Sequence, residues 1–278
     1  MMNTEPTEPT EPTERAHCAV IGLGEAGAKY AAALTETGWS VVGFDPGPVS
    51  TPPGVTRVDR AADAVRGAKL ILVLTAAKAS HPVAESVVGQ LASGACYADF
   101  TSSAPSAMRA VADLVEGAGA EFCDVAILGP VSWHGAQTPL MVAGNGAAQV
   151  AEVARRWGAH VEIVDGPPGS AMAHKLLRSV LMKGLAGVVT EAVTAGAAAG
   201  YEMWIRDQIA AQLAGDGHAV IDRLLSGTRT HADRRAHEMH DTAAYLEELG
   251  VPAELTHATE NALRRIADEA QQRADEAC

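Results

Sequence analysis

The sequence is poor in aromatic residues, in cysteine and in positive charge. Of its 278 residues only 4% are Phe, Trp or Tyr, and 21 Lys and Arg stand against 34 Asp and Glu, for a net charge of −13 at pH 7. A chain without a basic stripe has nothing with which to neutralise phosphates, so nucleic acid is excluded as a partner. The same deficit argues against docking on an anionic membrane surface.

Long hydrophobic runs are missing as well. No uncharged apolar run reaches the roughly 18 residues that a membrane span needs. The nearest candidate, residues 184–200, contains Glu191 and many small residues, which is typical of a packed helix. The N-terminus has neither the basic nor the apolar region of a signal peptide. We therefore expect a cytoplasmic protein without a membrane partner.

The four cysteines form no CxxC pair, and no histidine lies near them at zinc spacing, so we expect no metal site. The histidines at 237 and 240 lack the HExxH spacing. Cys18, Cys96 and Cys123 fall in expected strands, which predicts core thiols in a reducing compartment.

A short repeat stands at the start of the chain. Residues 4–14 read TEPTEPTEPTE, which carries four glutamates and no base. This segment has no apolar surface to bury and its prolines block a helix, so residues 1–15 are predicted to be a disordered acidic tail. The remaining chain is still acidic, and its length predicts about two domains.

Residues 16–166 alternate between strand and helix patterns. Expected strands lie at 17–22 and 40–44, and residues 69–75 (KLILVLT) form the apolar run of a strand buried on both faces. Further strands are expected near residues 96–100, 121–127, 139–143 and 160–164, with helices between them. Repeated βα units predict an α/β fold with a doubly wound parallel sheet of Rossmann type.

The pattern changes after the Gly-Pro-Pro-Gly cluster at 166–169. One long helix is predicted from 170 to about 199, followed by helices near 202–214, 218–225, 231–248 and 253–275. Residues 167–278 are therefore predicted to be an all-helical C-terminal domain that begins with a linking helix.

Residues 22–27 read GLGEAG, a GxGxxG motif directly after the first strand and at the start of a helix. Gly22 permits a tight turn, Gly24 lets the backbone approach a pyrophosphate, and Gly27 lets the helix pack closely on the strand. Asp45 ends the second strand, where a carboxylate accepts hydrogen bonds from the ribose and repels a 2′-phosphate. NAD is therefore favoured over NADP.

Four segments resemble the β-hydroxyacid dehydrogenases, relatives of 6-phosphogluconate dehydrogenase. They are the glycine motif, residues 99–105 (DFTSSAP), residues 124–130 (DVAILGP) and residues 169–179, in which Lys175 stands at the family's catalytic lysine. The resemblance implies a hydride exchange between the cofactor and an alcohol or carbonyl, with Lys175 as proton donor or acceptor. The residues expected to bind the cofactor are Gly22, Leu23, Gly24, Glu25, Ala26, Gly27, Asp45, Thr75 and Thr101.

The chain also departs from the family pattern. Leu128 replaces a serine, Pro130 a glycine and Ser179 an asparagine, and His237 stands where a lysine is common. A divergent branch is therefore predicted. The residues expected to bind substrate are Thr101, Ser102, Gly129, Arg178, Ser179 and His237.

An apolar helix with cationic neighbours lowers the pKa of a lysine toward neutrality, which suits proton transfer. Lys175 lies in such a stretch, and Arg178 can pair with an anionic group on the substrate. The leading hypothesis is an NAD-dependent dehydrogenase that acts on a small, acidic molecule of hydroxy acid type.

Two alternatives remain. An imine reductase shares the domain plan, and Leu128 with Trp133 suits a less polar substrate, although the lysine counts against it. A non-catalytic dinucleotide sensor is the other. Either way, the apolar surface of the linking helix and the family resemblance together predict a homodimer joined through the helical domain.

Overall fold

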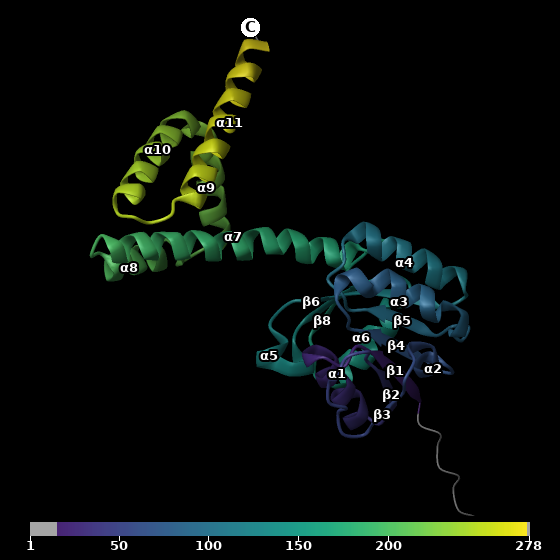
Figure 1. Cartoon of the computed structure of the whole chain (residues 1–278). Coiled ribbons are helices and arrows are strands. Elements are labelled where there is room, and N and C mark those ends of the chain that lie inside the picture. The colour runs from purple at the N-terminus through teal and green to yellow at the C-terminus, as the bar shows by residue number, and fades with distance from the viewer. Residues whose placement is uncertain (1–15, 277–278) are drawn as a thin grey trace, which may run out of the picture. The chain divides into compact units, whose positions relative to one another are not determined.

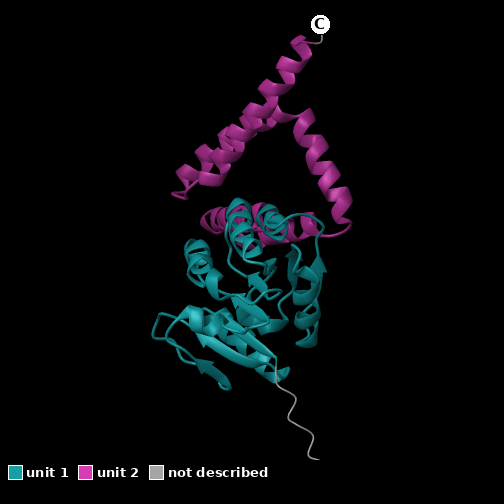
Figure 2. Cartoon of the chain, turned by 90° about the vertical axis from the view of Figure 1, so that its right-hand side faces the viewer, with its two compact units in different colours: residues 1–178 teal, residues 179–278 magenta. Residues whose placement is uncertain are grey.

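The structure is a computed structural model that describes residues 16–276, so the predicted acidic tail and Cys278 lie outside the described residues. The chain divides into two compact units, residues 1–178 and 179–278 (Figure 2). We call them the sheet unit and the helical unit. The division falls twelve residues beyond the start of the predicted helical domain.

An eight-stranded sheet forms the centre of the sheet unit, in the order β3-β2-β1-β4-β5-β6-β7-β8 (Figure 1). The strands are β1 (His17–Ile21), β2 (Ser40–Phe44), β3 (Val55–Arg57), β4 (Leu70–Val73), β5 (Cys96–Asp99), β6 (Glu121–Ile127), β7 (Leu140–Ala143) and β8 (Val161–Ile163). The predicted Rossmann-type sheet is confirmed, and its strands are parallel from β3 to β6.

The direction of β7 differs from the expected all-parallel sheet, because β7 pairs antiparallel with β6. The connection between them contains only α5 (Val131–His134) and a 3₁₀ turn (Gly135–Gln137). A parallel pair needs a full crossover, usually a helix that packs on the sheet. Here the chain turns back along the edge of β6, and β8 then pairs parallel with β7.

Helices cover both faces of the sheet. They are α1 (Glu25–Glu36), α2 (Ala61–Val65), α3 (Ser80–Val87), α4 (Pro105–Gly117) and α6 (Ala147–Arg156). Helices α1 and α6 pack on one face and α2, α3 and α4 on the other. In β4, Leu70 and Leu72 enter the first core while Ile71 and Val73 enter the second, which confirms a strand buried on both sides.

The three described cysteines, Cys18, Cys96 and Cys123, are free and buried in this unit. Burial raises the pKa of the Cys96 thiol to about 12, so it stays protonated at neutral pH. The prediction of core thiols is confirmed.

The helical unit holds most of α7 (Ser170–Ala198), then α8 (Glu202–Leu213), α9 (Gly217–Thr230), α10 (Ala232–Glu248) and α11 (Glu254–Glu276). Helix α9 is longer than predicted. The first two turns of α7 pack in the sheet unit, where Ala171 and Met172 are fully buried.

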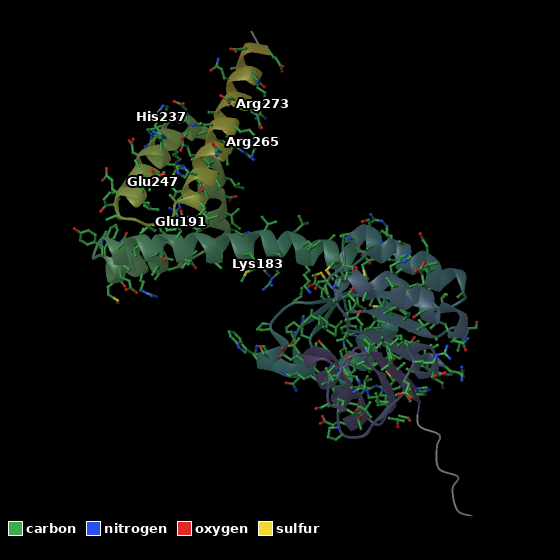
Figure 3. The ribbon with its side chains drawn as sticks, in the orientation of Figure 1. Lys183, Glu191, His237, Glu247, Arg265 and Arg273 are labelled. Atoms are coloured by element: carbon green, nitrogen blue, oxygen red, sulfur yellow. The ribbon has the colours of Figure 1, made fainter. Side chains whose placement is uncertain are left out.

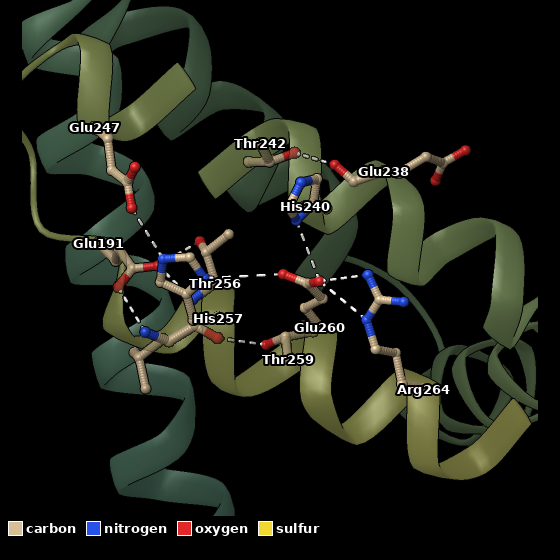
Figure 4. Close-up of polar contacts among 11 residues, drawn as sticks. Glu191, Glu238, His240, Thr242, Glu247, Thr256, His257, Thr259, Glu260 and Arg264 are labelled. Carbon is tan, nitrogen blue, oxygen red and sulfur yellow. Dashed lines mark hydrogen bonds and ion pairs between the residues drawn. The ribbon is translucent and has the colours of Figure 1, made fainter. Parts of the chain in front are cut away.

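Carboxylates tie the helical unit together (Figure 4). Glu191 of α7 accepts hydrogen bonds from the Leu255 and Thr256 backbone N–H groups at 2.9 and 2.8 Å, and so caps α11. Glu260 lies between Arg264 and His240, at 2.7 and 3.4 Å. Helix α7 is long and apolar enough to cross a membrane by length and composition, which by itself is weak evidence, and it also carries the Glu191 carboxylate that bonds α11.

Candidate active site

The turn after β1 has the geometry that the glycine motif predicts. Gly22 adopts φ +94°, and a Cβ there would lie 2.5 Å from the Leu74 carbonyl oxygen. A Cβ on Gly27 would lie 1.8 Å from the Gly22 oxygen. At Gly24, by contrast, no atom of the described residues lies within 4 Å of a built Cβ. The turn is therefore packed tightly from within and open on the side that a phosphate would approach.

Helix α1 begins at this turn with no side-chain cap on its first N–H groups, because its N-cap residue is Gly24. The Ala28 N–H donates to the Gly24 carbonyl at 2.9 Å, one turn into the helix. Unsatisfied N–H groups and the helix dipole favour an anion at such an end. The residues present thus fit the pyrophosphate of a dinucleotide.

Asp45 follows β2 beside this turn. Its Oδ2 accepts a hydrogen bond from the Leu23 N–H at 2.8 Å, and its Oδ1 accepts one from the Gly47 N–H at 2.7 Å. Each carboxylate oxygen keeps a further lone pair for a ribose hydroxyl. Asp45 therefore stands where the sequence predicts it, and it also links the glycine turn to the segment after β2.

The order of the strands reverses here. The sheet runs outward from β1 through β2 and β3 on one side, and from β4 onward on the other. Ligands of open α/β sheets bind at the carboxyl ends of the strands where the order reverses. The Gly22–Gly24 turn follows β1 and Thr75 follows β4, so both predicted cofactor segments lie at this reversal.

The segment after β5 is organised by a buried carboxylate. Asp99 Oδ1 accepts a hydrogen bond from the Thr101 N–H at 2.8 Å, and Asp99 Oδ2 accepts one from the Ser80 hydroxyl at 2.5 Å. Burial raises the pKa of Asp99, and these hydrogen bonds oppose the rise. The Thr101 and Ser103 hydroxyls share a hydrogen bond at 2.7 Å, and Thr101 is only 2% exposed. Ser102 is exposed, so its hydroxyl is the one that this turn presents to a ligand.

Lys175 meets this turn from a distant part of the sequence. Its Nζ donates a hydrogen bond to Ser102 Oγ at 3.1 Å, across 73 residues of chain. Both residues belong to the sheet unit, as do the glycine turn and Asp45. The predicted catalytic lysine and the predicted substrate serine are therefore in direct contact.

Asp124, which the sequence analysis did not single out, holds the start of α7. Its Oδ2 accepts a hydrogen bond from the Met172 N–H at 3.0 Å, one turn before Lys175. Its Oδ1 is buried and has no hydrogen-bond partner in residues 16–276. Burial raises the pKa of Asp124 to about 6, the Met172 N–H opposes the rise, and the Asp99 carboxylate adds to it. Its place at the head of the 124–130 motif is the signal that could have identified it.

The connection after β6 carries Gly129, which is exposed. Lys29 of α1 donates a hydrogen bond to the Val131 carbonyl at 2.9 Å and so joins this connection to the dinucleotide helix. Trp133 follows, with 80% of its surface exposed.

The remaining predicted residues lie farther along the chain. Arg178 is exposed on α7, and Ser179 Oγ accepts a hydrogen bond from Lys183 at 3.4 Å. His237 is on α10 in the helical unit, where its Nδ1 lies 3.0 Å from the Asp233 carbonyl (Figure 3). Their roles toward substrate stay predictions.

Family models match both parts of the chain. Residues 17–164 match the NAD binding domain of 6-phosphogluconate dehydrogenase. Residues 197–266 match a domain of unknown function. A comparison with curated proteins finds no match.

Solved structures share the fold over most of the chain. The conserved protein MTH1747, of unknown function and described as structurally similar to 3-hydroxyacid dehydrogenases, is 25% identical with a TM-score of 0.60, and the match covers 94% of this chain and 99% of that one.

Two imine reductases are structurally similar at lower identity. The enzyme from Myxococcus stipitatus, a V8 variant in complex with NAD+, has a TM-score of 0.76 at 18% identity, covering 92% and 94% of the two chains. The enzyme from Aspergillus terreus, in complex with NADPH4, has a TM-score of 0.74 at 17% identity, covering 93% and 96%.

The glycine turn, the strand order and the family match over more than half of the chain lead to the same assignment. The protein belongs to the family of NAD(P)-dependent oxidoreductases that carry the NAD binding domain of 6-phosphogluconate dehydrogenase.

Proposed function

We propose that the protein is an NAD-dependent dehydrogenase that interconverts a small anionic alcohol, of hydroxy acid type, and the corresponding aldehyde or ketone. The observation that carries the proposal is the 3.1 Å contact between Lys175 Nζ and Ser102 Oγ, in the unit that holds the glycine turn. A lysine beside a hydroxyl-bearing turn provides a proton at the point where a carbonyl oxygen would sit.

NAD supplies the hydride acceptor or, when reduced, the hydride donor. In the direction of reduction, the carbonyl carbon takes the hydride and its oxygen takes a proton from the Lys175 ammonium. In oxidation, the neutral Lys175 amine takes the hydroxyl proton. Ser102 orients Lys175, and the exposed Arg178, one turn later on α7, pairs with the anionic group of the substrate.

NAD is proposed over NADP because Asp45 places a carboxylate beside the dinucleotide turn. Solved structures of similar fold contain either NAD+ or NADPH4, so the fold is compatible with both. A cytoplasmic location is part of the proposal and agrees with the free thiols of the core.

A homodimer joined through the helical unit is also proposed. In this unit a cavity of about 510 Å³ opens between α7, α8, α10 and α11, and its lining is mostly apolar. Large side chains such as Met203 and Trp204 are exposed beside it, and exposed apolar patches of this kind mark interfaces.

The test is a screen for NADH oxidation with small carbonyl acids, followed by Lys175→Met. Loss of general acid catalysis lowers kcat by about 10² to 10⁴. The matched control is Lys69→Met, because Lys69 is an exposed lysine that directly precedes β4, at the amino ends of the strands and away from the glycine turn. Full turnover by Lys175→Met on the identified substrate would contradict the proposal.

A second candidate is an imine reductase. It is favoured by the structural neighbours and by the apolar, exposed side chain of Trp133 on the connection after β6. A parallel panel of cyclic imines separates the two activities. Turnover of imines without turnover of carbonyl acids would favour this second candidate.

A further inference from the structure

Residues 45–49 (DPGPV), which follow β2, have more hydrogen-bond acceptors than donors in their backbone. Two of the five are prolines, which have no N–H to donate, yet every residue carries a carbonyl that needs a donor. This segment also bears Asp45, the residue on which the proposed cofactor preference depends. Donors for these carbonyls must therefore come mostly from outside the segment.

Arg57 supplies the missing donors. Its Nη2 donates to the Asp45 carbonyl at 2.8 Å and to the Gly47 carbonyl at 2.7 Å, and its Nη1 donates to the Val49 carbonyl. One guanidinium thus binds three alternate carbonyls of a five-residue segment. A planar fork of five N–H groups can do this, whereas the single ammonium of a lysine cannot bridge the same span.

The sheet explains why the arginine reaches there. Arg57 ends β3 and lies in register with Gly43 of β2, two residues before Asp45. Its half-buried side chain reaches the segment that follows β2. The Gly43 carbonyl accepts a hydrogen bond from the Val58 N–H at 3.0 Å, which keeps the two strands paired up to this point.

The contacts of Asp45 complete the arrangement. With the backbone held by Arg57, the carboxylate bonds the Gly47 N–H on one side and the Leu23 N–H of the glycine turn on the other. We propose that Arg57 is a positioning residue of the cofactor site: it holds residues 45–49 so that the Asp45 carboxylate faces the adenosine ribose, and through Asp45 it supports the preference for NAD. The inference rests on the proposed function, since it requires that the glycine turn binds NAD.

An arginine near this position has a different role in other dinucleotide folds, where it accommodates a 2′-phosphate. Here the guanidinium is engaged by three carbonyls and lies next to a residue whose carboxylate repels phosphate. The two roles predict opposite changes in cofactor preference when the arginine is replaced, so one experiment separates them.

The experiment measures the Kd of NADH and of NADPH by calorimetry for the wild type, Arg57→Lys and Arg57→Met. The matched control is Arg60→Met, an exposed arginine three residues later. For both Arg57 variants the Kd of NADH rises about tenfold, as expected for the loss of charge-assisted hydrogen bonds, while that of NADPH changes less than about twofold. Arg60→Met leaves both values as in the wild type.

Amide exchange gives a second readout that needs no cofactor. In the folded Arg57→Lys protein, the peptide that contains Gly47 exchanges faster than in the wild type, whereas peptides of β4 and β5 do not change. Unchanged exchange of this peptide would overturn the inference.

Other outcomes overturn it in distinguishable ways. If the variants lose more affinity for NADPH than for NADH, the guanidinium binds a 2′-phosphate. If they lose equal affinity for both dinucleotides, or if Arg57→Lys binds NADH as the wild type does, Arg57 does not influence the cofactor preference. If the wild type binds neither dinucleotide, or prefers NADPH, then the proposed NAD-dependent function fails and the inference with it.

Discussion

The two units of the chain differ in how many of their large apolar side chains are buried. The sheet unit buries them in two cores, one on each face of the sheet. In the described part of the helical unit one small cluster is buried, formed by Ala243, Leu246, Val251 and Ala253, and Ala232, Ala236 and Leu263 are buried outside it. The large apolar side chains of this unit are mostly exposed, among them Val180, Leu181, Val188, Tyr201, Met203, Trp204, Leu213, Ile221, Leu224, Leu225 and Tyr245.

Charged groups are used in similar ways in the two units. The sheet unit buries Asp99 and Asp124 and uses both to position backbone. The helical unit likewise buries Glu260 and uses Glu191 to position backbone, and in both units most ion pairs join residues three or four apart, such as Arg206 with Glu202 and Arg156 with Glu152, which add little stability. The larger exposed apolar surface of the helical unit is the observation that supports the proposed homodimer.

The largest expected effect tests this contrast directly with two exposed tryptophans. Trp204, on the helical unit, has a side chain that is 61% exposed in the single chain, and Trp204→Glu places a charge there. Trp133→Glu places the same charge on the sheet unit. An unpaired charge buried in an interface costs about 3–5 kcal/mol, so Trp204→Glu raises the dimer Kd at least about 100-fold. Sedimentation velocity measures it, with Trp133→Glu as the matched control. If Trp204→Glu leaves the association state unchanged, the contrast between the units does not reflect an interface.

The next effect concerns Asp124 and the stability of the sheet unit. Its pKa is raised to about 6 in the folded protein from an ordinary 3.8, so the folded state binds the proton more tightly. This group's contribution to stability is complete below pH 3.8 and is lost as the pH rises through 6, a loss of about 3 kcal/mol.

Asp124→Asn removes that pH dependence and keeps an oxygen that can accept from the Met172 N–H. Urea unfolding between pH 4 and 7 compares the two proteins. The wild type is expected to lose more stability over this range than the variant does. Identical pH slopes would show that Asp124 titrates normally.

A smaller effect is expected at the glycine turn, where two substitutions differ sharply. At Gly24 an added methyl group has open space and the backbone φ is an ordinary −63°, so Gly24→Ala changes the stability little. The same methyl group, however, faces the proposed pyrophosphate. Overpacking costs about 1–3 kcal/mol, so the Kd of NADH rises about tenfold or more. Gly27→Ala instead meets the Gly22 oxygen and lowers the melting temperature. Unaltered NADH binding by a folded Gly24→Ala protein would place the cofactor elsewhere.

The smallest effect sharpens the role of the contact with Lys175. Ser102→Ala removes the acceptor at 3.1 Å, and one hydrogen bond contributes about 1 kcal/mol, so kcat falls about fivefold. The Kd of NADH stays constant, because Ser102 is not part of the glycine turn. Ser132→Ala, an exposed serine on the connection after β6, is the comparison variant. A change in the Kd of NADH with constant kcat would reassign Ser102 to the cofactor.

The sequence predicts features that depend on near neighbours. The strand and helix of the glycine motif, the fully buried β4 and the long α7 follow from short patterns of apolar residues, and each is present. The direction of β7 is not predicted, because it depends on whether a connection crosses the sheet or returns along its edge, and both possibilities leave the same local pattern in residues 139–143.

The site residues show the same difference between what local sequence patterns predict and what long-range contacts decide. The resemblance singles out Lys175 and, in residues 99–105, Thr101, with Ser102 predicted beside it, and the fold brings Lys175 and Ser102 together across 73 residues. Thr101, predicted beside them, has a buried hydroxyl that bonds Ser103. Asp124 and Arg57 were missed, because they bind backbone N–H and carbonyl groups, which every residue carries and which therefore leave no pattern in the sequence.

By itself, then, the sequence determines the dinucleotide turn and the family, since these depend on residue types at fixed short spacings, and it predicts Lys175 as the reactive lysine. Only the tertiary structure decides how that lysine is held, which residue orders the segment bearing Asp45, and how much apolar surface the helical unit leaves exposed. These depend on hydrogen bonds and packing between segments far apart in the chain, and such contacts form only once the sheet and helices have assembled.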